Sequence, residues 1–212
     1  EIPLSDWSSD VCSSDLLDDI LIKPTWESIP ENMNYRISID IDPGTSFGTG
    51  QHETTQLCIR NIEKHMKLGD QILDLGCGSG ILSIICLKLG ADHVMGTDID
   101  PICMEACREN MRRNQIEQTK YHFYCGDLIS DPKIKDMISV KEYDIVVANI
   151  LADIIIPMAP VVYPYLKKGG YFITSGIIDF KENPVKEALI EAGFEIIETN
   201  YQGEWVSITV RK

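Results

Sequence analysis

A glycine-rich segment carries the clearest chemical signal in the sequence. Residues 74–80 read DLGCGSG, after a short apolar run and before an apolar stretch of helical length. Gly76, Gly78 and Gly80 let the backbone turn tightly and let a ligand approach amide groups at the start of a helix. The dinucleotide fingerprint G-x-G-x-x-G is not matched, because Ile81 stands three residues after Gly78. We therefore expect Gly76 and Gly78 to contact a nucleoside that carries no diphosphate.

Two aspartates follow later apolar runs. Asp98 ends the run GTD about 20 residues beyond the glycine segment, where a carboxylate can accept hydrogen bonds from both hydroxyls of a ribose. Asp127, in CGD, can bind the amino group of an adenine, although this residue fits a turn or a helix cap equally well. A ribose site without a diphosphate loop indicates S-adenosylmethionine as the cofactor rather than a nicotinamide nucleotide.

Asn149 is a third polar residue at the end of an apolar run, VVAN. A buried amide in such a run needs hydrogen-bond partners. One interpretation is a backbone hydrogen bond at the end of a strand. The other is contact with the methionine part of the cofactor or with the incoming nucleophile, which makes Asn149 a candidate for both cofactor binding and catalysis.

A regular alternation of strands and helices must position these residues. Apolar runs predict strands at 71–75, 93–98, 121–125, 142–150 and 170–176, and helices are predicted at 81–90 and 101–114. Such an alternation produces an α/β fold, a doubly wound and mostly parallel sheet of seven strands of the Rossmann-like type. Two final strand-like runs, 194–201 and 204–212, predict an antiparallel hairpin at one edge of that sheet.

Single residues mark the ends of the two predicted helices. Gly90 is typical of the position just after a helix. Pro101 suits the first turn of the next helix, and Asp100 before it is expected to cap that helix rather than to bind a ligand.

The chain divides into three parts. Residues 1–16 contain the triplet SSD twice and show no period, so we expect a disordered acidic tail or a non-native segment. Residues 17–45 are expected to form a linker with leading strands. Residues 46–212 are expected to form a catalytic domain that binds S-adenosylmethionine.

The leading strands are predicted at 20–26 and 35–42, where apolar and polar residues alternate. A loop with three glycines and a proline follows. The next segment, 54–66, has a loose helical spacing of apolar residues, and either Thr54 or Thr55 is expected to cap its N-terminus.

Composition excludes several classes of protein. The chain has 212 residues and a net charge of −14. This negative charge disfavours non-specific binding to the phosphate backbone of a nucleic acid. No apolar stretch reaches the length of a membrane span, and no signal peptide is found at the N-terminus. The seven cysteines form no C-x-x-C pair, and Cys103 and Cys107 lack further zinc ligands nearby. We therefore expect no metal site and reduced thiols in a cytoplasmic protein.

Together, the strand-end motifs resemble those of class I S-adenosylmethionine-dependent methyltransferases. The segments DPGTSFGTGQHETTQLC, DLGCGSGILSI, GTDIDP and VVANILAD resemble more specifically the ribosomal-protein-L-eleven methyltransferase family, PrmA-type, over about residues 20–212. The resemblance implies methyl transfer to the α-amine and the lysine side chains of a protein of the large ribosomal subunit. It also implies cofactor contacts at Thr55, Gly76, Asp98 and Asn149.

The resemblance implies further features around this core. Phe47, Gly48 and His52 belong to the family's signature loop and are expected near the cofactor. The family carries an N-terminal substrate-recognition domain, whereas only a short acidic segment precedes the catalytic region here. The sequence therefore predicts a catalytic domain without that recognition domain, and no contact with nucleic acid or membrane is expected.

The implied chemistry needs a neutral amine in line with the sulfur–methyl bond. An α-amine, with a pKa of about 7.7–8.0, is partly neutral near pH 7.5, whereas a lysine, with a pKa of about 10.4, must lose its proton through desolvation or to water. We expect Asn149 and the loop at 44–55 to position the amine without a dedicated strong base. The alternatives are methylation of a nucleic acid or small molecule, which the lack of a PP motif after Asn149 disfavours, and a non-catalytic cofactor-binding module.

Overall fold

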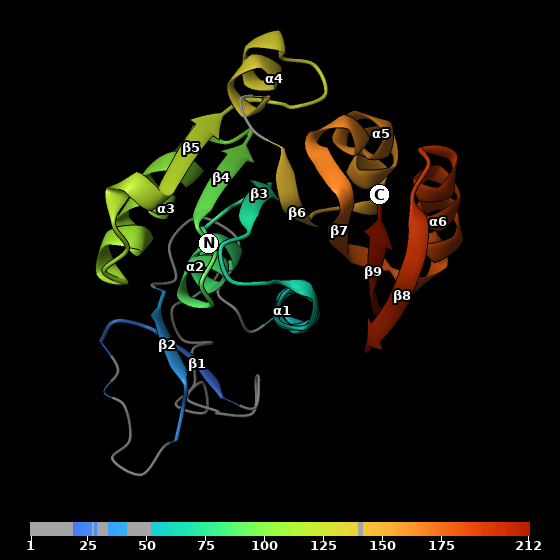
Figure 1. Cartoon of the computed structure of the whole chain (residues 1–212). Helices are drawn as coiled ribbons and strands as arrows, with labels where there is room; N and C mark the ends of the chain where they lie inside the picture. The colour runs from blue at the N-terminus through green and yellow to red at the C-terminus, as the bar shows by residue number, and fades with distance from the viewer. Residues whose placement is uncertain (1–18, 27, 29–33, 42–51, 140–141) are drawn as a thin grey trace.

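A seven-stranded sheet lies at the centre of the computed structural model (Figure 1), which describes residues 19–26, 28, 34–41, 52–139 and 142–212. The strands are β3 (Gln71–Leu75), β4 (His93–Asp98), β5 (Tyr121–Cys125), β6 (Tyr143–Asn149), β7 (Leu166–Ile178), β8 (Glu195–Gln202) and β9 (Trp205–Arg211). They lie in the order β5-β4-β3-β6-β7-β9-β8. Neighbours from β5 to β7 pair in parallel, and β9 pairs antiparallel with both β7 and β8. The predicted mostly parallel sheet with a C-terminal hairpin is confirmed.

Helices cover both faces of this sheet, as expected for a doubly wound fold. They are α1 (Glu53–His65), α2 (Ile81–Lys88), α3 (Pro101–Arg113), α4 (Pro132–Ile138), α5 (Ala152–Val162) and α6 (Glu182–Glu191). Apolar residues of α1, α2 and α3 form a core cluster on one face, and those of α4, α5 and α6 form a second cluster on the other. Because both faces are buried, the middle of β6, residues 145–148, is a continuous apolar run rather than an alternating one.

Local residues explain where two of the helices begin and end. Gly90, with a φ of 105°, follows α2, and the next amide, of Ala91, donates to the carbonyl of Cys86. The Asp100 side chain accepts a hydrogen bond of 2.9 Å from the backbone N–H of Ile102 and caps α3, with Pro101 in the first turn. The predicted helix-end glycine and the predicted aspartate cap are both confirmed.

The prediction for the start of α1 is wrong. His52, not Thr54 or Thr55, occupies the N-cap, and its ring nitrogen Nδ1 accepts from the backbone N–H of Thr54 at 3.3 Å. The helix begins at Glu53, so both threonines lie inside its first turn. Thr55 is completely buried there and faces the sheet instead of capping the helix.

The leading strands form a separate two-stranded parallel sheet, β1 (Ile20–Lys23) and β2 (Ile37–Asp40), both shorter than predicted. Strand β2 is fixed to the end of α3 by the side chain of Asn114. Its amide oxygen accepts from the N–H of Asp40 at 2.9 Å, and its amide nitrogen donates to the carbonyl of Asp40 at 2.8 Å. An ion pair of 2.8 Å between Lys23 and Asp40 joins the two strands.

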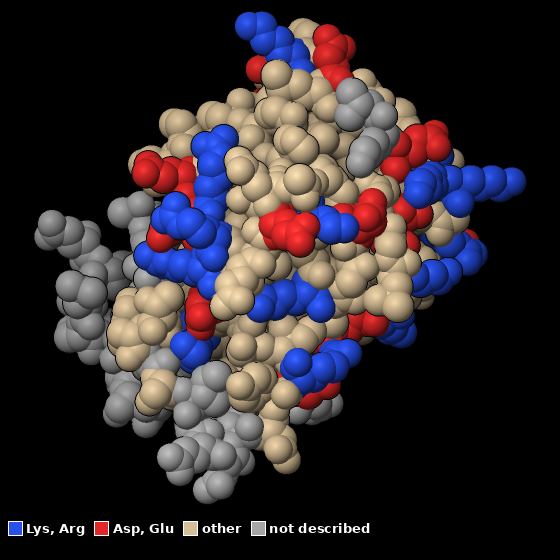
Figure 2. All heavy atoms as spheres, turned by 60° about the vertical axis from the view of Figure 1, so that its left-hand side comes forward, with Lys and Arg blue, Asp and Glu red and all other residues tan. Residues whose placement is uncertain are grey.

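Acidic and basic side chains are interspersed on the side of the molecule where α3 lies. Figure 2 shows this side with blue and red groups next to each other. Glu109 pairs with both Arg112 and Arg113, and Lys120 pairs with Asp92 at 3.2 Å. Among the described residues, no helix is long and apolar enough to cross a membrane.

Candidate functional site

The carboxyl ends of the parallel strands open into one cleft. Successive helices change faces between β3 and β6, and ligands of open α/β sheets bind outside the strand ends at such a switch point. A cleft of about 800 Å³ lies there, within the usual size range of ligand sites. The six residues expected at a cofactor site all line this cleft, namely Thr55, Gly76, Gly78, Asp98, Asp127 and Asn149.

The glycine segment forms a tight loop between β3 and α2. Gly76 has a φ of 72°, a backbone conformation that favours glycine. A Cβ atom built on Gly76 would lie 2.4 Å from Cγ2 of Ile150, so this position also needs glycine for space. The backbone N–H groups of Gly76 and Cys77 both donate to the carbonyl of Thr97, at 2.8 and 3.1 Å. The loop is therefore held against the end of β4.

Asp98 at the end of β4 is oriented by two backbone groups. Its Oδ2 accepts from the N–H of Gly78 at 2.9 Å, and its Oδ1 accepts from the N–H of Asp100 at 3.0 Å. The carboxylate is half-buried and lines the cleft. Each carboxylate oxygen can accept more than one hydrogen bond, so both remain able to bind a ligand.

Asp127 has the contacts of a turn residue as well as a place in the cleft. Its carboxylate accepts from the N–H of Ile129 at 2.9 Å and from the hydroxyl of Ser130 at 2.6 Å. These hydrogen bonds, that of Ser130 first, hold the pKa of Asp127 below its usual range. The structure thus places Asp127 at the site while also giving it the local role that the sequence left open.

Asn149 at the end of β6 is joined to α1. Its amide nitrogen donates to the hydroxyl of Thr55 at 3.2 Å, and Thr55 is completely buried. This contact orients the amide and uses one of its two N–H groups inside the protein. The amide oxygen Oδ1 is the group of Asn149 that remains to accept a hydrogen bond from a bound molecule.

The cleft has an aromatic wall that the sequence did not reveal. His52 and Trp205 both line the cleft, with their ring centroids 5.0 Å apart and their planes at 65°. Trp205 begins β9, far along the chain from His52, so no local pattern connects the two. Phe47 and Gly48, which were also expected near the cofactor, lie outside the described residues.

Apolar side chains complete the cleft. Ile99 and Leu151 line it although they are 75% and 67% exposed, and Ile129, Ile154 and Met158 line it as well. Ile99 and Leu151 stand one and two residues after Asp98 and Asn149, respectively. An apolar residue just after a polar strand end was therefore an available sequence signal for these positions.

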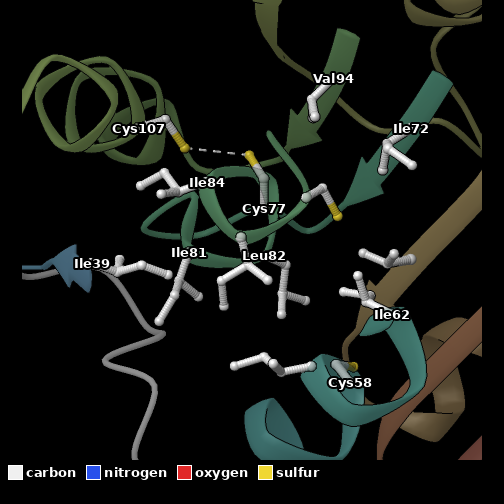
Figure 3. Packing of buried hydrophobic residues seen from close by; sticks show 14 of the residues in the cluster. Ile39, Cys58, Ile62, Ile72, Cys77, Ile81, Leu82, Ile84, Val94 and Cys107 are labelled. Atoms are coloured by element: carbon white, nitrogen blue, oxygen red, sulfur yellow. Dashed lines mark hydrogen bonds between the residues drawn. The ribbon is translucent and has the colours of Figure 1, made fainter. Parts of the chain in front are cut away.

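Thiols pack beneath the glycine loop. Figure 3 shows Cys77 of the loop and Cys107 of α3 pointing toward each other, with their sulfur atoms 3.6 Å apart. Burial raises the pKa of Cys103 to about 12, and hydrogen bonding with Cys107 and burial raise that of Cys77 further. Cys77 and Cys103 stay protonated at neutral pH, and the six cysteines among the described residues are all free.

A carboxylate is buried next to these thiols. Asp74 of β3 is 1% exposed, and its Oδ2 accepts a hydrogen bond of 2.6 Å from the hydroxyl of Ser83 in α2. Burial, with a smaller effect from Asp98, raises the pKa of Asp74 to about 6, while the hydrogen bond to Ser83 opposes this rise. Asp74 does not line the cleft but lies directly below the loop that does.

Comparison with known proteins gives a consistent result. The sequence model of the family described as "Ribosomal protein L11 methyltransferase (PrmA)" matches residues 6–212. A ribosomal protein L11 methyltransferase of Agathobacter rectalis is 57% identical over 203 residues, which cover 94% of this chain and 63% of the relative. That of Lachnospira eligens is 49% identical, with 92% and 61% covered. The chain thus spans about three fifths of the length of these curated relatives.

A solved structure agrees with the sequence comparisons. The crystal structure of a ribosomal protein L11 methylase from Lactobacillus delbrueckii subsp. bulgaricus has a TM-score of 0.83 to this chain at 34% identity. The similarity covers 93% of this chain and 97% of that one. A TehB-like methyltransferase from Corynebacterium glutamicum, at 22% identity and a TM-score of 0.58, shares the fold.

Proposed function

Because the chain belongs to the ribosomal protein L11 methyltransferase (PrmA) family, we propose that it transfers methyl groups from S-adenosylmethionine to ribosomal protein L11. The acceptors are the α-amine and lysine ε-amines of that protein. The observation that carries the proposal is the single cleft that joins the glycine loop, Asp98 and Asn149, three motifs at the ends of three different strands.

The residues of the cleft fit S-adenosylmethionine. Asp98 is oriented by Gly78 and Asp100 and keeps acceptor capacity for two ribose hydroxyls. The hydrogen bonds of the loop at Gly76 keep it against the end of β4, so that Gly78 and Asp98 lie together in the cleft. The apolar groups near Ile99 and Ile129 suit an adenine face, and Asp127 is the acceptor we assign to the adenine amino group. When bound, the cofactor supplies a methyl group activated by a positively charged sulfur.

In this proposal, Asn149 positions the acceptor amine. Thr55 holds the amide nitrogen, so Oδ1 is left to accept a hydrogen bond from the amine and to direct its lone pair toward the methyl group. Apolar groups such as Leu151 and Trp205 exclude water and thereby lower the pKa of an entering lysine. No dedicated base is assigned, and the proton passes to water.

We assign the catalytic unit to residues 46–212 and leading strands with a linker to residues 17–45. Strand β2 contacts the end of α3 through Asn114, and β1 pairs with β2. The two leading strands therefore lie beside the catalytic unit rather than in its sheet. No role is assigned to residues 1–16.

Methyl transfer from labelled cofactor to purified ribosomal protein L11 tests the proposal, together with cofactor affinity measured by calorimetry. We expect Asn149→Ala to lower lysine methylation by about 100-fold while cofactor affinity changes less than threefold, because positioning is lost and the cofactor contacts stay. Asn200→Ala on β8, outside the cleft, is the matched control and is expected to be neutral.

Two other outcomes separate the alternatives. An equal loss of affinity and transfer in Asn149→Ala would make this residue a cofactor contact only. Tight cofactor binding by the unmodified chain without any labelled product would identify a binding module that lacks catalytic competence.

A further inference from the structure

Large apolar side chains are exposed around the cleft. Ile99 and Ile102 follow β4, Leu151 and Ile154 follow β6, and Phe180 follows β7, with exposed fractions from 45% to 75%. These positions come after the ends of three parallel strands, so they gather at one edge of the sheet. Single exposed apolar residues are common, whereas a group of them beside a cleft is typical of a surface that binds another molecule.

The two sides of the cleft carry different parts of this apolar group. Ile99 and Ile102 come directly after Asp98, on the side assigned to the ribose and the adenine. Leu151 stands two residues after Asn149, on the side assigned to the acceptor amine. The exposed apolar residues after β6 and β7 are therefore those that a molecule carrying the amine meets as it enters the cleft.

A charged contact ties Phe180 to the start of α5. Phe180 is 70% exposed and lies in η4 (Asp179–Lys181), the short 3-10 helix between β7 and α6. Lys181 pairs at 2.8 Å with Asp153 in the first turn of α5, and Ile154, the next residue of that helix, lines the cleft. Phe180 itself does not line the cleft, so it stands beside the space assigned to the cofactor rather than in it.

A second contact ties η4 to the C-terminal hairpin. The backbone N–H of Asp179 donates to the carbonyl of Glu204 at 2.9 Å. Glu204 is followed by Trp205, which belongs to the aromatic wall of the cleft. The start of α5, η4 and the hairpin therefore form one connected surface beside the cleft. We call this surface the acceptor rim, and its exposed apolar residues are Leu151, Ile154 and Phe180.

The charge of the acceptor rim is negative. Asp179 and Glu204 are exposed, and neither forms an ion pair with another residue that the structure describes. The charge of Asp153 is balanced by Lys181. Two carboxylates without a balancing cation attract the ammonium group of a lysine or of a chain terminus. The rim therefore suits a protein segment that carries both a lysine and an apolar side chain.

We propose that the acceptor rim is the docking surface for the lysine-bearing segment of the substrate protein, with an apolar side chain of that segment packed on Phe180 while the lysine enters the cleft beside Asn149. This inference rests on the proposed function, because the segment belongs to ribosomal protein L11. Phe180 determines specificity in this arrangement, since it contacts the protein that carries the amine and touches neither the cofactor nor the reacting atoms. Asp179 and Glu204 attract the segment before it docks.

Two measurements on the whole chain test this docking role. The first is the Kd for purified ribosomal protein L11 in the presence of S-adenosylhomocysteine, measured by biolayer interferometry, which requires no turnover. The second is the KM and kcat of methyl transfer from labelled cofactor. Phe180→Ala is expected to raise both Kd and KM for L11 by at least about fivefold, because an aromatic anchor in a protein interface typically contributes this much.

Further readouts distinguish docking from general damage. In Phe180→Ala, kcat and the affinity for the cofactor are expected to change less than about twofold, because the residue stands outside the cleft. Phe180→Leu, which keeps an apolar side chain, is expected to restore most of the affinity for L11. Ile190→Ala is the matched control, since Ile190 on α6 is 57% exposed and lies outside the cleft. It is expected to leave Kd and KM unchanged.

Asp179→Asn tests the attraction by charge. Asparagine keeps an oxygen that can accept from the backbone N–H of Phe180, as Asp179 does at 2.6 Å, so the turn is retained. Association of L11 is expected to slow by about threefold at low salt, and the difference is expected to vanish near about 0.5 M salt, where charges are screened. Glu191→Gln, an exposed position in the last turn of α6, is the control and is expected to keep the association rate.

The outcomes separate this inference from the proposed function. Equal Kd values for L11 in Phe180→Ala and Ile190→Ala would overturn the inference and leave the proposed function intact. A parallel loss of cofactor affinity in Phe180→Ala would do the same, because it would place the residue in the cofactor site. Binding of L11 that depends on Phe180 without any methylated product would support the inference and overturn the proposed catalysis. A chain that neither binds nor methylates L11 would overturn both.

Discussion

Gly76 shows how one backbone position controls the cleft. It combines a left-handed φ of 72° with a neighbour, Ile150, that leaves no room for a Cβ. The first property costs a side-chain-bearing residue about 1–2 kcal/mol, and the second forces the loop or Ile150 to move. Because the N–H of Gly76 anchors the loop to Thr97, any such movement also disturbs Gly78 and the oriented carboxylate of Asp98.

We expect Gly76→Ala to weaken binding of S-adenosylmethionine by at least about tenfold, measured by calorimetry, because backbone strain and the collision with Ile150 both displace the loop. Gly69→Ala is the matched control, since Gly69 has a φ of 86° but nothing within 4 Å of a built Cβ and lies outside the cleft. It is expected to lower stability modestly and to leave affinity unchanged. Equal losses of affinity in the two variants would show that the collision is unimportant.

At the residue scale, the sequence predicted the polar groups of the cleft better than its walls. Gly76, Asp98 and Asn149 stand at strand ends, and parallel strands bring such ends together whatever their separation in the chain. The contact between His52 and Trp205 depends instead on where α1 and the last strand lie in three dimensions. No periodicity or spacing encodes that contact, so Trp205 was missed.

At the scale of elements, the attachment of β2 to the end of α3 depends on one side chain. Asn114 is 6% exposed and makes hydrogen bonds to both backbone groups of Asp40 and to the carbonyl of Asn110. A single amide thus bonds both backbone groups of Asp40 and shares the carbonyl of Asn110 with the backbone N–H of Asn114. Buried polar groups without partners cost about 1–3 kcal/mol.

Asn114→Ala is therefore expected to lower the free energy of unfolding by about 1–3 kcal/mol, measured by urea denaturation. Hydrogen exchange should accelerate in β1 and β2 while the strands of the main sheet keep their protection. Gln118→Ala, an exposed neighbour without a described contact, is the control and should be neutral. Uniform acceleration across the main sheet would contradict the local role of Asn114.

The elements themselves were predicted closely where the apolar run alone defines them. Strands β3, β4 and β5 have the predicted bounds, because each is a short run between turn-forming residues. Strand β7 begins at Leu166 rather than at Gly170, because Leu166 pairs with Tyr143. The strand therefore includes polar residues and a glycine before Gly170, which the apolar pattern did not assign to a strand. The cap of α1 was misplaced because threonine propensity suggested Thr54 or Thr55, whereas tertiary packing buries Thr55.

At the scale of the whole molecule, the buried carboxylate of Asp74 makes the stability of the fold depend on pH. Its pKa is higher in the folded protein, at about 6, than its ordinary value of 3.8. The folded state therefore favours the protonated form, and the stability that Asp74 contributes is complete below about pH 3.8 and is lost as the pH rises through 6. At neutral pH the ionised carboxylate destabilises the empty protein.

We expect Asp74→Asn to be more stable than the unmodified chain by up to about 3 kcal/mol near pH 7.5, because the uncompensated charge is removed. The advantage should shrink to less than about 1 kcal/mol as the pH falls to about 4, where Asp74 is protonated in the folded state and only partly ionised in the unfolded state. Urea denaturation at the two pH values measures this difference. The same difference at both values would show that the substitution acts through packing and not through charge.

The order of the strands in the sheet has a consequence for how the protein is made. Strand β9 is the last strand in the chain, yet it lies inside the sheet between β7 and β8 and brings Trp205 to the cleft. During synthesis, the glycine loop, Asp98 and Asn149 emerge from the ribosome well before this strand. The nascent chain therefore cannot close its cleft while these residues are being translated, and the site is completed only when the final strand leaves the exit tunnel and inserts between two neighbours that are already made.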